Sequence, residues 1–254
     1  MGPLAWRTIG TLLLAVLSTL PKHASAATVQ VAGPAHGCLI DLDGRIDRAT
    51  PRLLGDAMRH ASGSDCLLRV NSPGGDLDAA IEAGRLIRRQ RAGTFVPEQA
   101  TCASACLLLF VGGVQRQALG GFSLHRAYSS RLMNSMDEAQ YSYRDINTRI
   151  RRYLDEMNIP ERLLNVMNSV PPGQARVMHP ARDLDMLREL HIVGEDPAWA
   201  DQHASAEARR LGISKQEYYG RQYRADELCN LRRATAATAR ESVLCRYDVI
   251  EGRR

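Results

Sequence analysis

The chain has 254 residues, with 33 Lys and Arg against 28 Asp and Glu and a formal net charge of +5 at pH 7. Because this excess is small and no dense basic stretch occurs, the composition gives no reason to expect nucleic acid as a partner. The length is ample for one domain with a buried core and an appendage. We place the domain at residues 27–195 and a helical extension at 196–254.

The first 26 residues have the pattern of a secretory signal. Arg7 precedes an apolar run from Ile9 to Leu20, and the small residues Ala24-Ser25-Ala26 follow. This order predicts cleavage after Ala26. The alternative is a membrane anchor, but spanning a bilayer takes about 20 apolar residues, and this run is shorter. No Cys lies near the cleavage site, which disfavours a lipoprotein. We therefore expect an exported protein, either periplasmic or secreted.

The predicted elements of the first half alternate between strand and helix. In chain order we expect a strand over 38–46, a helix over 50–61, a buried strand over 66–70, a helix over 76–90 and a strand over 93–96. The helix over 76–90 has apolar residues at 77, 80, 81, 86 and 87, a helical spacing. Strand, turn and helix recurring in this order predict an α/β fold with parallel strands.

The second half is richer in helices. We expect a helix that opens at Cys102, a strand over 122–125 that ends in His125, and helices over 136–157, 160–167 and 184–190. After about residue 196 the composition shifts towards Ala, Arg and Glu, which indicates exposed helices.

Asn71-Ser72-Pro73-Gly74-Gly75 lies between a predicted strand and a predicted helix. Pro73 restricts one dihedral angle, and the two glycines permit backbone conformations that side chains forbid. Free N–H groups at a helix N-terminus favour negative charge. The alternative is an ordinary turn, since Pro-Gly-Gly is common in turns.

Ser104 lies among small residues, and His125 follows 21 residues later at a strand end. Alone, Ser104 is better explained as a helix cap or a packing residue than as a nucleophile. A lone His is more often a surface or structurally satisfied residue than a catalyst. Together with the glycine turn they form a different pattern, because acyl transfer needs a nucleophile, a base and oxyanion donors.

This order resembles the Clp protease and its relatives in the ClpP/crotonase superfamily. The resemblance rests on Asn71–Gly75, on Ser104 placed 32 residues after Ser72, and on His125, and it covers about Cys38 to Val193. It implies an α/β fold of ClpP/crotonase-like stacked ββα units, here with a small helical C-terminal extension. It also implies assembly into a homo-oligomer through the helix over 136–157.

The resemblance implies a role for each site residue. Ser104 is the expected nucleophile and His125 its base, and the backbone N–H groups of Gly75 and Ala105 form the expected oxyanion hole. The segment after His125 would line an extended substrate, together with Gly74, Asp76 and Leu77.

The third member of a catalytic triad is missing from its expected place. The family's acid would lie near positions 174–175, where this chain has Gln174 and Ala175. Asp183 and Asp185 are nearby, but they belong to the next predicted helix. A Ser–His dyad, or one assisted by a neutral group, is the favoured interpretation, with Asp183 or Asp185 as the alternative.

Six cysteines, an even number in a chain predicted to be exported, indicate disulfides. Their spacing does not suit zinc, and we expect no metal and no cofactor. Two residues four apart on a helix rarely bridge, so we expect Cys102 and Cys106 each to pair with a distant partner, Cys66 or Cys38. Cys229 and Cys245 would join the C-terminal helices. A catalytic Cys is disfavoured where free thiols are oxidised.

The favoured function is an exported serine hydrolase, a peptidase acting on peptides or unfolded polypeptides. Because an exported enzyme cannot be served by a cytoplasmic ATP-driven unfoldase, we expect no ATPase partner. One alternative is a weak or inactive ClpP-like protein that binds peptides or assembles, since fold does not determine function. The other is a crotonase-like enzyme acting on acyl-CoA. Export counts against it, because CoA metabolism is intracellular.

Overall fold

The computed structural model describes residues 25–32, 38–60, 66–129, 132–229 and 239–254. The predicted signal segment therefore lies outside the described residues, apart from Ser25 and Ala26. Within the described ranges, no helix is long and apolar enough to cross a membrane.

The described strands form two sheets, and the predicted α/β class with parallel strands is confirmed. The larger sheet has the order β1-β2-β3-β4-β6-β9, with its four central strands parallel and antiparallel strands at both edges. The smaller sheet has the order β5-β7-β8. Stacking of repeated ββα units stays a prediction. The strands are β1 Thr28–Ala32, β2 Leu39–Asp43, β3 Leu67–Asn71, β4 Gly93–Val96, β5 Thr101–Ala103, β6 Gln115–Ala118, β7 Gly121–Leu124, β8 Arg176–Met178 and β9 Gly194–Glu195.

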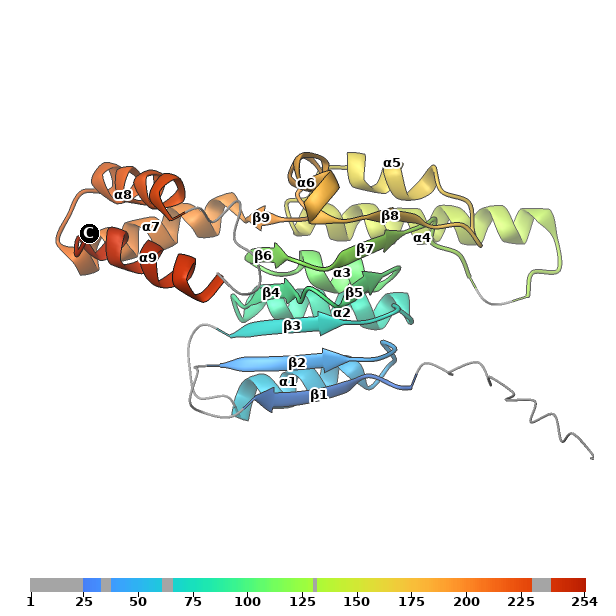
Figure 1. Cartoon of the computed structure of the whole chain (residues 1–254). Coiled ribbons are helices and arrows are strands. Elements are labelled where there is room, and N and C mark those ends of the chain that lie inside the picture. The colour runs from blue at the N-terminus through green and yellow to red at the C-terminus, as the bar shows by residue number, and fades with distance from the viewer. Residues whose placement is uncertain (1–24, 33–37, 61–65, 130–131, 230–238) are drawn as a thin grey trace, which may run out of the picture.

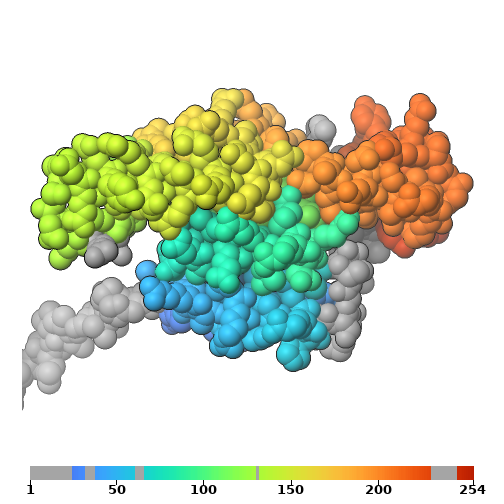
Figure 2. Space-filling view, turned by 180° about the vertical axis from the view of Figure 1, so that it is seen from behind, coloured from blue at the N-terminus to red at the C-terminus, as the bar shows by residue number. Residues whose placement is uncertain are grey.

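Helices cover the larger sheet and continue beyond it. Figure 1 shows α1 and α2 along one face of this sheet, with α4, α5 and α6 on the side of β6, away from β1. In the space-filling view, one end of α4 projects past the body of the molecule (Figure 2). The helices are α1 Thr50–His60, α2 Leu77–Arg89, α3 Cys106–Val111, α4 Met136–Glu156, α5 Arg162–Asn168, α6 Pro180–Glu189, α7 Pro197–Leu211, α8 Lys215–Leu228 and α9 Ala239–Glu251.

The main core is built from apolar residues of the two sheets and of α1 to α6. Helix α3 lies deepest in it, with all of its residues buried. Gly84 lets α2 pack closely against α3 and against Tyr153 of α4, because a Cβ at this position would lie 1.9 Å from the Tyr153 hydroxyl. That hydroxyl donates to the carbonyl of Leu108 at 2.6 Å. Burial holds the pKa of Tyr153 well above its ordinary value, so the group stays a donor.

Helices α7, α8 and α9 have small clusters of buried residues of their own, separate from the main core. They gather at one end of the molecule (Figure 1). A domain boundary near residue 195 stays a prediction.

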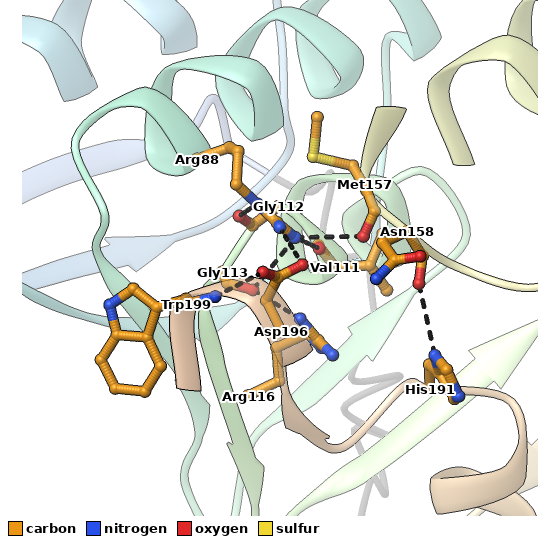
Figure 3. A network of polar contacts seen from close by, with 10 residues as sticks. All are labelled: Arg88, Val111, Gly112, Gly113, Arg116, Met157, Asn158, His191, Asp196 and Trp199. Atoms are coloured by element: carbon orange, nitrogen blue, oxygen red, sulfur yellow. Dashed lines mark hydrogen bonds and ion pairs between the residues drawn. The ribbon is translucent and has the colours of Figure 1, made fainter. Parts of the chain in front are cut away.

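A network of polar contacts joins the start of α7 to the main core (Figure 3). Arg88 of α2 contacts the Asp196 carboxylate at 2.6 Å and donates to the carbonyls of Gly112 and Met157 at 3.0 and 3.2 Å. Burial of Asp196 opposes its ionisation, but the hydrogen bond from the Trp199 N–H and the charge of Arg88 outweigh this effect. The pKa of Asp196 is therefore below its ordinary value. Arg88 thus bonds to carbonyls at the C-terminal ends of α3 and α4 and to Asp196, the N-cap residue of α7.

Candidate active site

Ser104 lies at a sharp turn between a strand and a helix. The prediction that a helix opens at Cys102 is wrong, because Thr101–Ala103 forms β5 and α3 begins only at Cys106. Ser104 between them has φ +54°, in the left-handed region that residues other than glycine rarely adopt. Such strain is frequent at functional sites.

Pairing of β5 with β7 explains why Ser104 and His125 come together. The two strands are parallel, with Ala103 opposite Ser123. The Ser104 N–H donates to the Ser123 carbonyl at 2.8 Å. His125 follows directly after β7, so both candidate residues lie at the same end of neighbouring strands.

The glycine turn packs against the Ser104 turn. The carbonyl of Ser72 accepts the Ala103 N–H at 2.9 Å, which links the two segments. Gly74 has φ +91°, and a Cβ there would lie 2.6 Å from the Ala103 carbonyl oxygen and 2.8 Å from the Ser104 Cβ. Gly75 has φ +147°, and its Cβ would lie 2.0 Å from the Ile46 carbonyl oxygen. Only glycine suits these two positions.

Five of the predicted site residues border one cavity of about 250 Å³, which we call the Ser104 cavity. These are Ser104, His125, Gly75, Ala105 and Leu77. The other two residues expected to line the substrate, Gly74 and Asp76, do not border it. Gly74 instead packs behind Ser104, and the Asp76 carboxylate caps α2 by accepting the Ala79 N–H at 2.9 Å. The complete lining is Arg45, Pro73, Gly75, Leu77, Ser104, Ala105, Leu108, His125, Ala127, Tyr128 and Met167.

Two backbone donors at this cavity have no acceptor. Within the described part of the chain, neither the Gly75 N–H nor the Ala105 N–H donates a hydrogen bond to a protein atom. Their neighbours are bonded: Asp76 donates to the Ile46 carbonyl and Ser104 to that of Ser123. Unpaired backbone N–H groups are rare away from water. Two such donors beside a serine and a histidine can stabilise a developing oxyanion.

The predicted carboxylates do not contact His125. The Asp183 carboxylate accepts the backbone N–H of His179 at 2.7 Å, and Asp185 is exposed on α6. The Nδ1 atom of His125 contacts the carbonyl oxygen of Arg126 at 2.8 Å. The ring also lies against Tyr128, with 5.9 Å between the ring centroids.

The cysteine pairing differs from the prediction for Cys102 and Cys106, which bridge each other with a Cα–Cα distance of 5.3 Å. The prediction placed both on one helix. The strand and turn that actually separate them bring the Cα atoms within bridging range. Cys38 pairs with Cys66, and the predicted Cys229–Cys245 bridge is confirmed. Three disulfides fit an oxidising, extracellular environment.

Sequence reasoning missed three residues of the cavity lining: Arg45, Leu108 and Met167. No local signal marks them, because they come from a loop after β2, from α3 and from α5. A second hollow of about 400 Å³ lies on the surface of α7 and has no His or Cys in its lining. Among the described residues, no three His, Cys, Asp or Glu side chains gather so as to hold a metal ion.

Comparisons with known proteins gave matches among solved structures alone. No family model matches the chain, and no curated protein matches it. One matching solved structure is a mutant of ClpP1 from Listeria monocytogenes, with 13% sequence identity and a TM-score of 0.45. The match covers 61% of this chain and 89% of that one. A likeness of this size assigns neither a family nor an activity.

Proposed function

We propose that this protein is an exported serine hydrolase that cleaves short or unfolded polypeptides. The observation that carries the proposal is the pair of unpaired N–H groups, on Gly75 and Ala105, at a cavity that Ser104 and His125 also border. A strained serine at a turn between strand and helix supports the same chemistry. Export is supported by the predicted signal segment and by the disulfides.

The reaction would proceed through an acyl-enzyme. The Ser104 hydroxyl attacks the substrate carbonyl carbon, and His125 accepts the hydroxyl proton. The carbonyl oxygen becomes an oxyanion that accepts the two backbone N–H groups, where one donor typically contributes about 3–4 kcal/mol of transition-state stabilisation. The intermediate collapses as His125 protonates the leaving amine. Water, deprotonated by His125, then releases the acyl group and restores the Ser104 hydroxyl.

The cavity lining indicates the side chains that such a substrate would carry. Leu77, Leu108 and Met167 offer apolar surface, and Arg45 adds a positive charge. We expect a preference for an apolar residue next to the scissile bond and for a carboxylate nearby. Peptide-library profiling of the wild type and Arg45→Gln measures this, and the carboxylate preference should disappear in the variant.

A fluorophosphonate probe tests the nucleophile in the folded, oxidised protein. The wild type should be labelled and Ser104→Ala should not, while His125→Ala should react about 10²- to 10⁴-fold more slowly. Ser205→Ala on α7 is the matched control, because its hydroxyl donates only to the Asp201 carbonyl, and it should label like the wild type. A wild type that is never labelled would overturn the hydrolase proposal. Labelling that persists in Ser104→Ala would show another nucleophile.

The environment of His125 favours one alternative. Because no carboxylate contacts its ring among the described residues, a protein that binds peptides in the Ser104 cavity without cleaving them fits the same geometry. Peptide binding measured by calorimetry, in protein that the probe does not label, would identify that case.

A further inference from the structure

Among the described residues, the His125 ring nitrogens contact one protein group, a backbone carbonyl. The His125 Nδ1 atom and the Arg126 carbonyl oxygen are 2.8 Å apart. A carbonyl oxygen can only accept, so Nδ1 must carry the proton of this hydrogen bond. In neutral imidazole the other nitrogen, Nε2, then has the free lone pair that a general base needs. The contact thus selects one tautomer and one ring orientation.

Arg126 itself is held to the end of α5 at several points. Its backbone N–H donates to the Val170 carbonyl at 2.9 Å. Its guanidinium donates to the Asn168 carbonyl from Nε at 3.1 Å and from Nη2 at 2.8 Å. A cation bound to the last carbonyls of a helix is favourably placed in the field of the helix.

The acceptor of these bonds is itself fixed to α4. The Asn168 side chain donates to the Asn147 side chain at 2.6 Å. The Arg126 guanidinium lies over the Tyr143 ring, 5.7 Å from its centroid. Contacts to two helices therefore hold the backbone N–H and the side chain of Arg126, the residue that carries this carbonyl.

We propose that the Arg126 carbonyl takes the orienting role that a carboxylate has in a Ser–His–Asp triad, and that the Arg126 side chain is the positioning residue that holds this carbonyl. The inference rests on the proposed function. A carbonyl dipole fixes the tautomer as a carboxylate does, but it carries no net charge and stabilises the imidazolium less. The site would therefore work as an oriented dyad, slower than a complete triad.

Nuclear magnetic resonance of ¹⁵N-histidine-labelled full-length protein tests the orientation without any need for activity. The His125 signals are identified by their loss in His125→Ala. The ring should show a protonated Nδ1 and an unprotonated Nε2 in its neutral form. A proton on Nε2, or rapid exchange between both tautomers, would overturn the inference even if the probe labels Ser104.

Labelling kinetics test the positioning role. Arg126→Met removes the two guanidinium bonds and keeps the aliphatic stem. We expect labelling to slow about 10- to 100-fold, the loss seen when the outer partner that orients a metal-binding histidine is removed. Arg126→Lys, which keeps a cation for the Asn168 carbonyl, should recover part of the rate. Arg151→Met is the matched control, because Arg151 also joins α4 to the start of α5, through Glu161, and does not contact Arg126. An unchanged rate in folded Arg126→Met would contradict the proposal. If the wild type is not labelled but shows the expected tautomer, the hydrolase function fails and the orientation of His125 stands.

Discussion

Replacing Arg88 should lower the stability of the main core and weaken the attachment of α7 to it. In Arg88→Met, the buried residue Asp196, which is 7% exposed, loses the cation that pairs with its carboxylate. The carbonyls of Gly112 and Met157 lose a donor in the same substitution. Breaking a buried pair by removing one partner costs about 3–5 kcal/mol. We expect the free energy of unfolding to fall by about 3 kcal/mol. This is the lower end of the range, because Arg116 stays near Asp196.

The control is the same substitution at an exposed pair. Arg69 makes two short bonds to the Asp41 carboxylate, but both side chains are about 40% exposed. Exposed pairs contribute about 0–1 kcal/mol. Urea unfolding of both variants, followed by circular dichroism, gives the comparison. If Arg88→Met costs no more than Arg69→Met, the assignment of the network as an anchor is refuted.

The same network predicts a dependence on pH. Because the folded-state pKa of Asp196 lies below its ordinary value, its contribution to stability is present above the unfolded pKa of about 3.9. It is lost as pH falls through the folded value. The difference in unfolding free energy between the wild type and Asp196→Asn should therefore be constant near neutrality and shrink in acid. A difference that grows on acidification would contradict this assignment.

Further variants test the candidate site and the contacts that support it. Gly75→Ala places a Cβ 2.0 Å from the Ile46 carbonyl oxygen, at a residue with positive φ. The backbone must therefore move, and probe labelling should fall by about 10²-fold or more, the loss typical of one oxyanion donor. A near-normal labelling rate would exclude Gly75 from the oxyanion hole. Replacing Cys102 and Cys106 together by Ala opens a short loop and should cost about 2 kcal/mol on the chain-entropy model while slowing labelling, whereas loss of the α8–α9 disulfide should leave the labelling rate unchanged. Tyr153→Phe leaves a buried carbonyl of α3 without its donor and should cost about 1–3 kcal/mol in urea unfolding; a neutral result would mean that water replaces the hydroxyl.

Local sequence patterns predicted the elements with strong periodicity. The helices over 77–89 and 136–156 and the strands over 67–71 and 93–96 appear within a few residues of their expected bounds. The strand at Gln115–Ala118 was not predicted because its sequence, Gln-Arg-Gln-Ala, is polar. It forms a strand because it pairs with β4 and with β9. Both partner strands lie elsewhere in the sequence, so no local pattern could predict the strand at Gln115–Ala118.

The sequence by itself determined the α/β class and the order of glycine turn, serine and histidine, because periodicity and spacing are local properties of the chain. Only the tertiary structure decided that Ser104 lies on a turn between strand and helix, since no glycine or proline marks that turn. It also decided that Cys102 bridges Cys106, and that the His125 ring contacts the Arg126 carbonyl instead of a carboxylate. These outcomes depend on how β5 pairs with β7 and where α5 ends, and such long-range contacts form only when the whole domain packs.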